Sequence, residues 1–254
     1  MRNFYILLML SFCLLQSCAS KKDILYFQDI AAAHMGEIDY KNPKIQINDI
    51  LSVKVSALMP ETAAPYNIGK IDMGSVPNVE TLKLQGYLVA DDGTIKFPIL
   101  GDITATEKTT SELEIEIQSI LKDEGHIKDP VVRIRILNSK ITIIGEVNKP
   151  GTYNFTEQNI TLPQALGYAG DLTINGERKD ILIIREEDNV RNVGHIDLTR
   201  SDWFESPYYY VKQNDVIVVN PNGPKVKSAG FIGNAGNVLT IVSLLLSTVV
   251  LLTR

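Results

Sequence analysis

Cys18 is the residue of this sequence best placed for a covalent modification. It follows the small residue Ser17 at the end of an apolar run, Phe4 to Leu15. The polar segment Ser20 to Asp23 begins directly afterwards, so the thiol stands at the boundary between an apolar and a polar stretch. A cysteine in this setting is suited to carry a lipid, which would tie the chain to a membrane.

The first 17 residues have the layout of a secretory signal peptide. Arg2 forms a short charged region, and the apolar run behind it is too short to span a bilayer comfortably. Leu15-Gln16-Ser17-Cys18 resembles a lipobox, so we expect a lipoprotein signal peptide over 1–17 and a lipidated tether over 18–44. Two alternatives stay open: ordinary cleavage after a small residue, and an uncleaved apolar anchor with an incidental cysteine. Lipidation would place the body outside the cytoplasm.

Other reactive side chains give no catalytic pattern. Cys13 and Cys18 are the only cysteines, so a disulfide framework cannot hold the body together. The three histidines, His34, His126 and His195, are isolated and lack the spacing of metal ligands. We therefore predict that the protein is not an enzyme and uses no cofactor. The net charge of -5 and the scattered lysines and arginines argue against nucleic-acid binding.

A group of aromatic residues near the end of the chain could stack on sugar rings: Trp203, Phe204 and Tyr208 to Tyr210. Such residues are more often strand and core residues. Both interpretations stay open at this point.

Hydrophobic periodicity predicts a first small α+β domain over 45–138. Alternation near 45–57 and after Pro130 indicates two strands, and 58–84 is predicted to be a long loop or an insertion. Asp91-Asp92-Gly93 between two alternating runs predicts a β-hairpin. A helix over about 110–123 is indicated by a capping box formed by Thr109 and Glu112.

A second mixed unit is predicted over 139–222, as a helix packed on a sheet. Strands are expected at 141–147, 152–155, 180–185, 195–198 and 216–220, and a short helix is expected between Thr161, with Gln164 as its capping-box partner, and Gly170. The two domains share one weak repeat. Asn48-Asp49 and Asn214-Asp215 each open a stretch of the form Asn-Asp-apolar-apolar-x-Val, which is also a common turn-into-strand sequence.

The C-terminal segment 223–254 is predicted to contain a transmembrane helix. No charged residue occurs from Ser228 to Thr253, and about 24 helical residues would measure roughly 36 Å, more than a hydrocarbon core of about 30 Å. Small and polar residues recur along it at three- and four-residue spacing: Gly233, Asn237, Thr240, Ser243 and Ser247. Such a stripe can pack against a neighbouring helix or face water, although serine and threonine are also tolerated elsewhere in membrane helices. Lys225 and Lys227 before the span favour the outer membrane.

Several motifs, in order, resemble the polysaccharide export family, the outer-membrane lipoproteins of the Wza type. They are Ile47 to Val53, Asp92 to Gly101, Gly145 to Tyr153, Leu162 to Leu166, Ala169 to Thr173 and Asn214 to Val219. The resemblance implies a polysaccharide-export domain, one SLBB β-grasp domain and structural roles for ten motif residues: Asp49, Asp92, Gly93, Pro98, Gly101, Gly145, Pro150, Gly151, Gly170 and Asp215. Asn48 and Asn214 replace the usual glycine, a mild change because asparagine tolerates positive φ. Only one β-grasp unit is visible, whereas members of this type can carry more.

The same resemblance implies a function. It predicts a homo-oligomeric ring whose C-terminal helices form a pore for passive export of capsule or exopolysaccharide through the outer membrane, with the body in the periplasm. Its implied partners are the polysaccharide, further copies of the chain and an inner-membrane polysaccharide co-polymerase or tyrosine kinase that supplies energy. The alternative is a non-pore periplasmic lipoprotein that binds glycan or serves as a scaffold.

Overall fold

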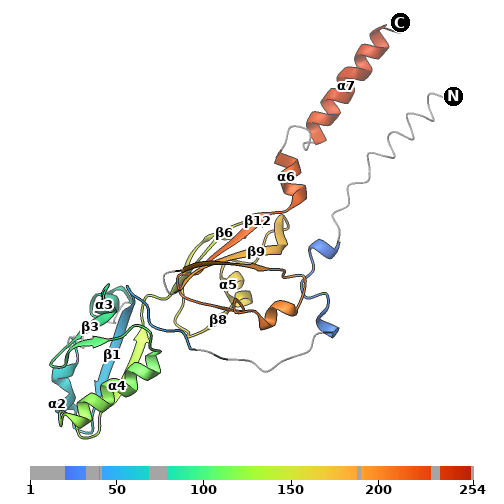
Figure 1. Ribbon diagram of the computed structural model, residues 1–254. Helices are drawn as coiled ribbons and strands as arrows, with labels where there is room; N and C mark the ends of the chain where they lie inside the picture. The colour runs from blue at the N-terminus through green and yellow to red at the C-terminus, as the bar shows by residue number, and fades with distance from the viewer. Residues whose placement is uncertain are drawn as a thin grey trace.

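The chain folds into two mixed domains of helices and strands, followed by two C-terminal helices (Figure 1). The structure is a computed structural model that describes residues 21–32, 40, 42–68, 79–187, 190–229 and 235–252. The predicted signal peptide, Cys18 and Gly233 lie outside the described residues. The expected α+β architecture with two domains is confirmed.

The first domain is built on a three-stranded antiparallel sheet. Strand β1 (Ile50–Ser56) lies between β2 (Tyr87–Leu88) and β5 (Val131–Ile136). Alternate residues of β1 and β5 are buried beneath helix α4 (Thr110–Asp123), which contributes three fully buried side chains, Leu113, Ile117 and Leu121. The predicted helix and both alternating strands are therefore present.

The prediction that the two strands flanking Asp91-Asp92-Gly93 pair as a hairpin is wrong. The turn itself forms, since Gly93 N donates to Ala90 O at 3.0 Å and Ala90 N donates to Thr94 O at 2.9 Å. However, β2 pairs with β1, while β3 (Thr94–Phe97) pairs with β4 (Gly101–Thr104) across a second turn. That second turn is allowed by positive φ at Ile99 and Gly101.

The stretch predicted as a long loop contains three short helices. They are α2 (Pro60–Ala63), η3 (Ala64–Tyr66) and α3 (Val79–Leu84). Ala63 and Tyr66 belong to the core of the first domain. The loop prediction fails because proline at the first turn of a helix is favourable, so the prolines here begin helices instead of excluding them.

The second domain contains a five-stranded sheet in the order β10-β9-β12-β6-β7. Its strands are β6 (Lys140–Gly145), β7 (Gly151–Asn154), β9 (Gly176–Glu187), β10 (Val190–Ile196) and β12 (Val216–Pro221). β12 runs parallel to β6 and antiparallel to β9. Helix α5 (Leu162–Tyr168) contributes to its core, and the domain is completed by β8 (Ile160–Thr161), β11 (Tyr210–Val211) and η4 (Asp202–Glu205).

The segment predicted as a tether packs against this second domain where it is described. It contains two 3-10 turns, η1 (Lys21–Asp23) and η2 (Ile30–Ala32). Phe27 N donates to Leu198 O at 3.2 Å, and the Phe27 ring lies 5.9 Å from that of Trp203. The aromatic side chains of Tyr26 and Phe27 hold this segment against the core of the second domain.

The C-terminal segment contains two helices where the structure describes it. Helix α6 (Gly223–Ala229) and helix α7 (Ala235–Leu252) are separate elements that project from the second domain (Figure 1). None of the helices in the described part of the chain combines the length and the apolar character that crossing a membrane requires, so the predicted transmembrane helix is not supported.

Candidate functional site at the domain junction

The repeated Asn-Asp sequence forms the same tight turn in both domains. Asn48 and Asn214 both adopt positive φ, 69° and 64°. Asp49 Oδ2 accepts a hydrogen bond from Gln46 N at 2.8 Å, and Asp215 Oδ2 accepts one from Lys212 N at 2.9 Å. Each aspartate thus closes a turn on the residue three positions earlier, directly before a strand.

These two turns contact each other across the junction between the domains. Gln213 Nε2 lies 2.7 Å and 2.8 Å from the two carboxylate oxygens of Asp49. Asn214 Nδ2 donates to Gln46 Oε1 at 3.4 Å, and Ser139 Oγ donates to Gln213 Oε1 at 3.5 Å. We call this set of contacts the junction, comprising Gln46, Asp49, Ser139, Gln213 and Asn214.

The Asp49 carboxylate is buried and accepts its hydrogen bonds from uncharged groups. It is 2% exposed, and its donors are the side-chain amide of Gln213 and the backbone of Gln46. Burial raises the pKa of Asp49 to about 6, against the lowering effect of those two hydrogen bonds. A carboxyl group in such a setting favours its neutral form more than a solvated one does.

The equivalent carboxylate of Asp215 is instead paired with Arg185. Arg185 Nε and Nη2 lie 2.9 Å and 2.7 Å from its two oxygens, and both side chains are almost fully buried. Burial raises the pKa of Asp215, and Arg185 opposes that shift. Arg185 also donates to Pro207 O and Tyr210 O, each at 2.9 Å, so its guanidinium group is well satisfied.

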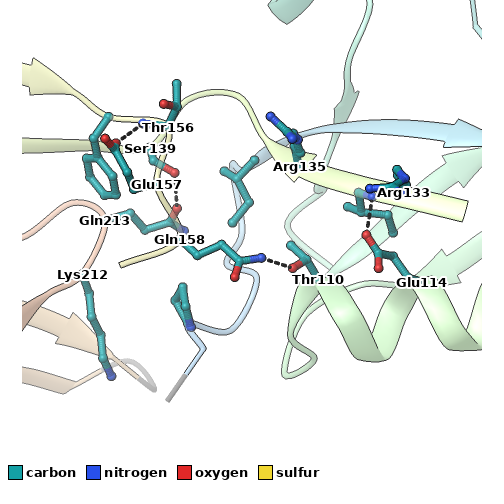
Figure 2. Close-up of a pocket in the computed structure, with 14 residues that line it drawn as sticks. Thr110, Glu114, Arg133, Arg135, Ser139, Thr156, Glu157, Gln158, Lys212 and Gln213 are labelled. Carbon is teal, nitrogen blue, oxygen red and sulfur yellow. Dashed lines mark hydrogen bonds between the residues drawn. The ribbon is translucent and has the colours of Figure 1, made fainter. Parts of the chain in front are cut away.

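A pocket of about 330 Å³ lies beside the junction, between the two domains (Figure 2). The first domain contributes Thr110 and Glu114 of α4 together with Arg133 and Arg135 of β5. Residues 155–158 of the second domain form the facing wall, and Gln158 Nε2 donates to Thr110 Oγ1 at 3.4 Å across the gap (Figure 2). The lining combines hydroxyl, amide and guanidinium groups with two carboxylates, Glu114 and Glu157, and the amine of Lys212. Such a lining suits a polar ligand with several hydrogen-bonding groups.

Metal binding has no support in the described part of the chain, where no group of three or more His, Cys, Asp and Glu residues is placed to hold an ion. Of the aromatic residues considered for sugar stacking, Trp203 is buried, Tyr208 to Tyr210 are half-buried and Phe204 is exposed. Trp203 is 4% exposed, donates from Nε1 to Arg200 O at 2.9 Å and packs on Phe27 and Tyr209. The core interpretation of these aromatics therefore fits Trp203 best.

Comparison with known families gives the two domains an identity. Residues 39–137 match the model described as polysaccharide biosynthesis/export protein, and residues 140–194 match the SLBB domain. The chain belongs to the polysaccharide export family. This family consists of export proteins, in agreement with the prediction that the chain is not an enzyme.

Individual relatives agree with this assignment over part of their length. The chain is 33% identical over 153 residues to the EPS I polysaccharide export outer membrane protein EpsA of Ralstonia nicotianae, and the match covers 56% of this chain and 38% of the relative. The exopolysaccharide production protein ExoF of Rhizobium meliloti is 31% identical over 96 residues, covering 36% of this chain and 23% of the relative. The chain thus matches well under half the length of these curated relatives.

In the export domain, the motif residues of the family occupy turns. Asp92 accepts hydrogen bonds from the backbone and side chain of Thr94, which lower the pKa of Asp92. Gly93 has a φ of 80°, and a Cβ there would lie 2.2 Å from Thr106 Oγ1. Pro98 and Gly101 belong to the turn that joins β3 to β4.

In the SLBB domain, the motif residues again shape the backbone. Gly145 ends β6 with a φ of 95°, and a Cβ there would lie 2.0 Å from Val219 O of β12. Pro150 and Gly151 lead into β7, and Gly170 follows α5 with a φ of 71°. Only two motif residues of the family, Asp49 and Asp215, belong to turns that meet at the junction.

Three residues of the predicted stripe, Thr240, Ser243 and Ser247, lie on helix α7. Thr240 Oγ1 donates to Gly236 O and Ser247 Oγ donates to Leu244 O, both at 2.8 Å, so these hydroxyl groups are satisfied within the helix. A shallow open groove runs along the stripe, lined by Leu239, Thr240, Ser243, Leu244 and Ser247. Asn237 lies in the same helix, and Gly233 lies outside the described residues.

No sequence motif predicts a role in the candidate site for Gln213, Arg185 or the two arginines of β5. For Arg185 a signal exists, because it continues the buried alternation of Ile181 and Ile183 with a charged residue. A charge at a buried position requires a partner. For Gln213 there is no such signal, since its role depends on contact with the other domain.

Proposed function

We propose that the chain is an outer-membrane polysaccharide export protein, forming a homo-oligomeric pore through which capsule or exopolysaccharide passes without energy input from this chain. The observation that carries the proposal is the ordered match of an export domain and an SLBB domain within one chain. Relatives named as EPS I polysaccharide export outer membrane proteins support the same location.

The proposal includes attachment through a lipid on Cys18, with the body in the periplasm. The lipobox-like sequence before Cys18 supports it. Labelled palmitate should be incorporated into the chain and into a Cys13→Ser control, but not into Cys18→Ser. Equal labelling of Cys18→Ser would exclude this anchor.

Assembly of copies is proposed to use the stripe on α7. Leu239 and Leu244 are 68% and 63% exposed, so the groove beside Thr240 and Ser243 is an uncovered, partly apolar surface. Small residues along such a groove allow a second helix to approach closely. Energy for polymer movement is proposed to come from an inner-membrane partner of the co-polymerase or tyrosine-kinase type.

Export is tested by complementing a deletion strain. The full chain should restore surface polysaccharide, whereas a chain ending after Ala229, and therefore lacking α7, should leave the polymer in the periplasm. Circular dichroism and protease resistance of the shortened protein check that both domains remain folded. Normal surface polysaccharide with the shortened chain would overturn the pore proposal.

A further inference from the structure

Three cations lie on one exposed face of the sheet in the export domain. Arg133 and Arg135 alternate with buried residues along β5, so both side chains point away from the core. In the antiparallel register Lys54 of β1 is directly opposite Arg133. Side chains directly opposite each other on neighbouring strands have Cβ atoms about 5 Å apart, and like charges in such a pair are destabilising.

Neither arginine has a partner in the part of the chain that the structure describes. By contrast, Arg185, Arg191 and Arg200 each pair with a carboxylate. The nearby carboxylate of Glu114 is used differently, because it accepts a hydrogen bond from the backbone of Ile134 at 2.7 Å. Among the described residues, the two guanidinium groups beside a third cation therefore form no ion pair, in a chain whose net charge is -5.

The same two arginines line the pocket between the domains. Around them the lining supplies neutral hydrogen-bonding groups, including Thr110, Ser139 and Gln158, and a further cation, Lys212 (Figure 2). The pocket also contains two carboxylates, Glu114 and Glu157, each of which accepts a backbone hydrogen bond. Guanidinium groups bind carboxylates through two parallel hydrogen bonds, and hydroxyl and amide groups exchange hydrogen bonds with sugar hydroxyls. The pocket thus contains groups that bind carboxylates beside groups that bind sugar hydroxyls.

We propose that the pocket between the export and SLBB domains binds an acidic saccharide, with Arg133 and Arg135 contacting its carboxylate groups and the neutral side chains contacting its hydroxyl groups. This inference rests on the proposed export function and specifies its substrate class: a polymer that carries uronic-acid or other carboxylate-bearing sugars. Lys54 adds to the positive potential that attracts such a chain.

Binding is measured with the purified full-length chain and oligogalacturonate as the probe. The matched uncharged probe is the same oligomer with its carboxyl groups reduced to alcohols. We expect the acidic oligomer to bind at least tenfold more tightly than the reduced one, and its affinity to fall as salt increases. Equal binding of the two oligomers, or no binding of the acidic one, would overturn the proposal.

Variants of Arg133 and Arg135 test whether these two residues bind oligogalacturonate. Arg133→Gln with Arg135→Gln should weaken binding of oligogalacturonate at least tenfold, because two charge-assisted contacts are lost. Arg191→Gln with Arg200→Gln changes the charge equally, at exposed residues outside the pocket, and should leave binding unchanged. Equal loss in both double variants would show that net charge alone is responsible. Thermal unfolding of each variant checks that the fold is retained.

The same variants distinguish an acidic saccharide from an acidic surface of a second copy. If Arg133→Gln with Arg135→Gln reduces the mass of the assembly while wild-type protein does not bind oligogalacturonate, the face is a contact between copies and the saccharide proposal fails. The export proposal is separate, because it depends on surface polysaccharide in cells. Export without saccharide binding would reject only this inference.

Discussion

Asp49 and Asp215 are equivalent residues whose buried carboxylates are stabilised by different partners. Both close the same turn and both are buried, at 2% and 1% exposure. Asp215 is neutralised by Arg185, whereas Asp49 receives only uncharged donors from Gln46 and Gln213. A buried charge without an opposite charge is unfavourable, so the two aspartates should differ in their contribution to stability.

Replacing Asp49 by asparagine should remove a pH-dependent loss of stability. The folded pKa of about 6 lies above the ordinary value of 3.8. The free energy of unfolding of the wild type should therefore decrease as pH rises through this range, by roughly 3 kcal/mol from Asp49 alone. Asp49→Asn should gain stability relative to wild type between about pH 4 and about pH 7, as measured by urea unfolding.

A matched control for this titration is Asp102→Asn, at an exposed position on β4. Because Asp102 is exposed, this variant should follow the wild-type pH profile. A constant difference between Asp49→Asn and wild type across the same pH range would show that the Asp49 carboxyl does not titrate in this interval.

Removal of Asp215 should be strongly destabilising. Asp215→Ala leaves the guanidinium group of Arg185 buried without its carboxylate, and breaking a buried pair in this way costs about 3–5 kcal/mol. Asp202→Ala breaks the exposed pair with Arg200 and should cost about 0–1 kcal/mol. Chemical denaturation of both variants measures the difference, and similar losses would contradict the importance of burial.

At the scale of single elements, a sequence pattern predicts a helix or strand correctly when all of its residues lie within that element. Both predicted capping boxes are present, Thr109 with Glu112 at α4 and Thr161 with Gln164 at α5. Each box depends on four consecutive residues, so the sequence contains the full information. The same holds for the alternating residues of β5, whose buried and exposed positions follow the predicted period.

Pairing between strands could not be predicted in the same way. Asp91-Asp92-Gly93 forms a turn, but β2 finds its partner in β1, more than thirty positions earlier in the chain. Likewise, Gln213 gives no local indication that its side chain reaches Asp49. The candidate site was therefore recognisable only as two similar turns, because the contact that joins them is tertiary.

Gly145 is a position where a strand requires glycine. Its φ is 95°, and a Cβ at this position would lie 2.0 Å from Val219 O, so alanine would displace β12 from β6. Gly145→Ala should lower the free energy of unfolding by about 3 kcal/mol or more. Gly101 has a φ of 80° but open space around an added methyl group, so Gly101→Ala should cost only about 1–2 kcal/mol. Thermal and urea unfolding compare the two; equal costs would mean that the close approach of the strands is unimportant.

At the scale of the whole molecule, the described contacts connect the export and SLBB domains through polar groups. Asp49, Gln213 and Asn214 link their turns, and Gln158 reaches Thr110 across the pocket. Helix α7, by contrast, projects from the second domain (Figure 1). Its apolar side chains Leu239 and Leu244 are exposed. The two domains thus have their own internal connections, which fits the proposal that copies assemble through the C-terminal helix.

Assembly through this helix predicts that bulky residues in its groove reduce the size of the oligomer. Ser243→Leu with Ser247→Leu fills the groove and should prevent close approach of a neighbouring α7, lowering the mass measured by light scattering in mild detergent. Val242→Leu places the same leucine side chain at a position outside the groove and should leave the mass unchanged. If the serine variant keeps the wild-type mass, or if both variants lose it equally, the groove on α7 does not hold the copies together. In that case the assembly would have to use the surfaces of the two domains.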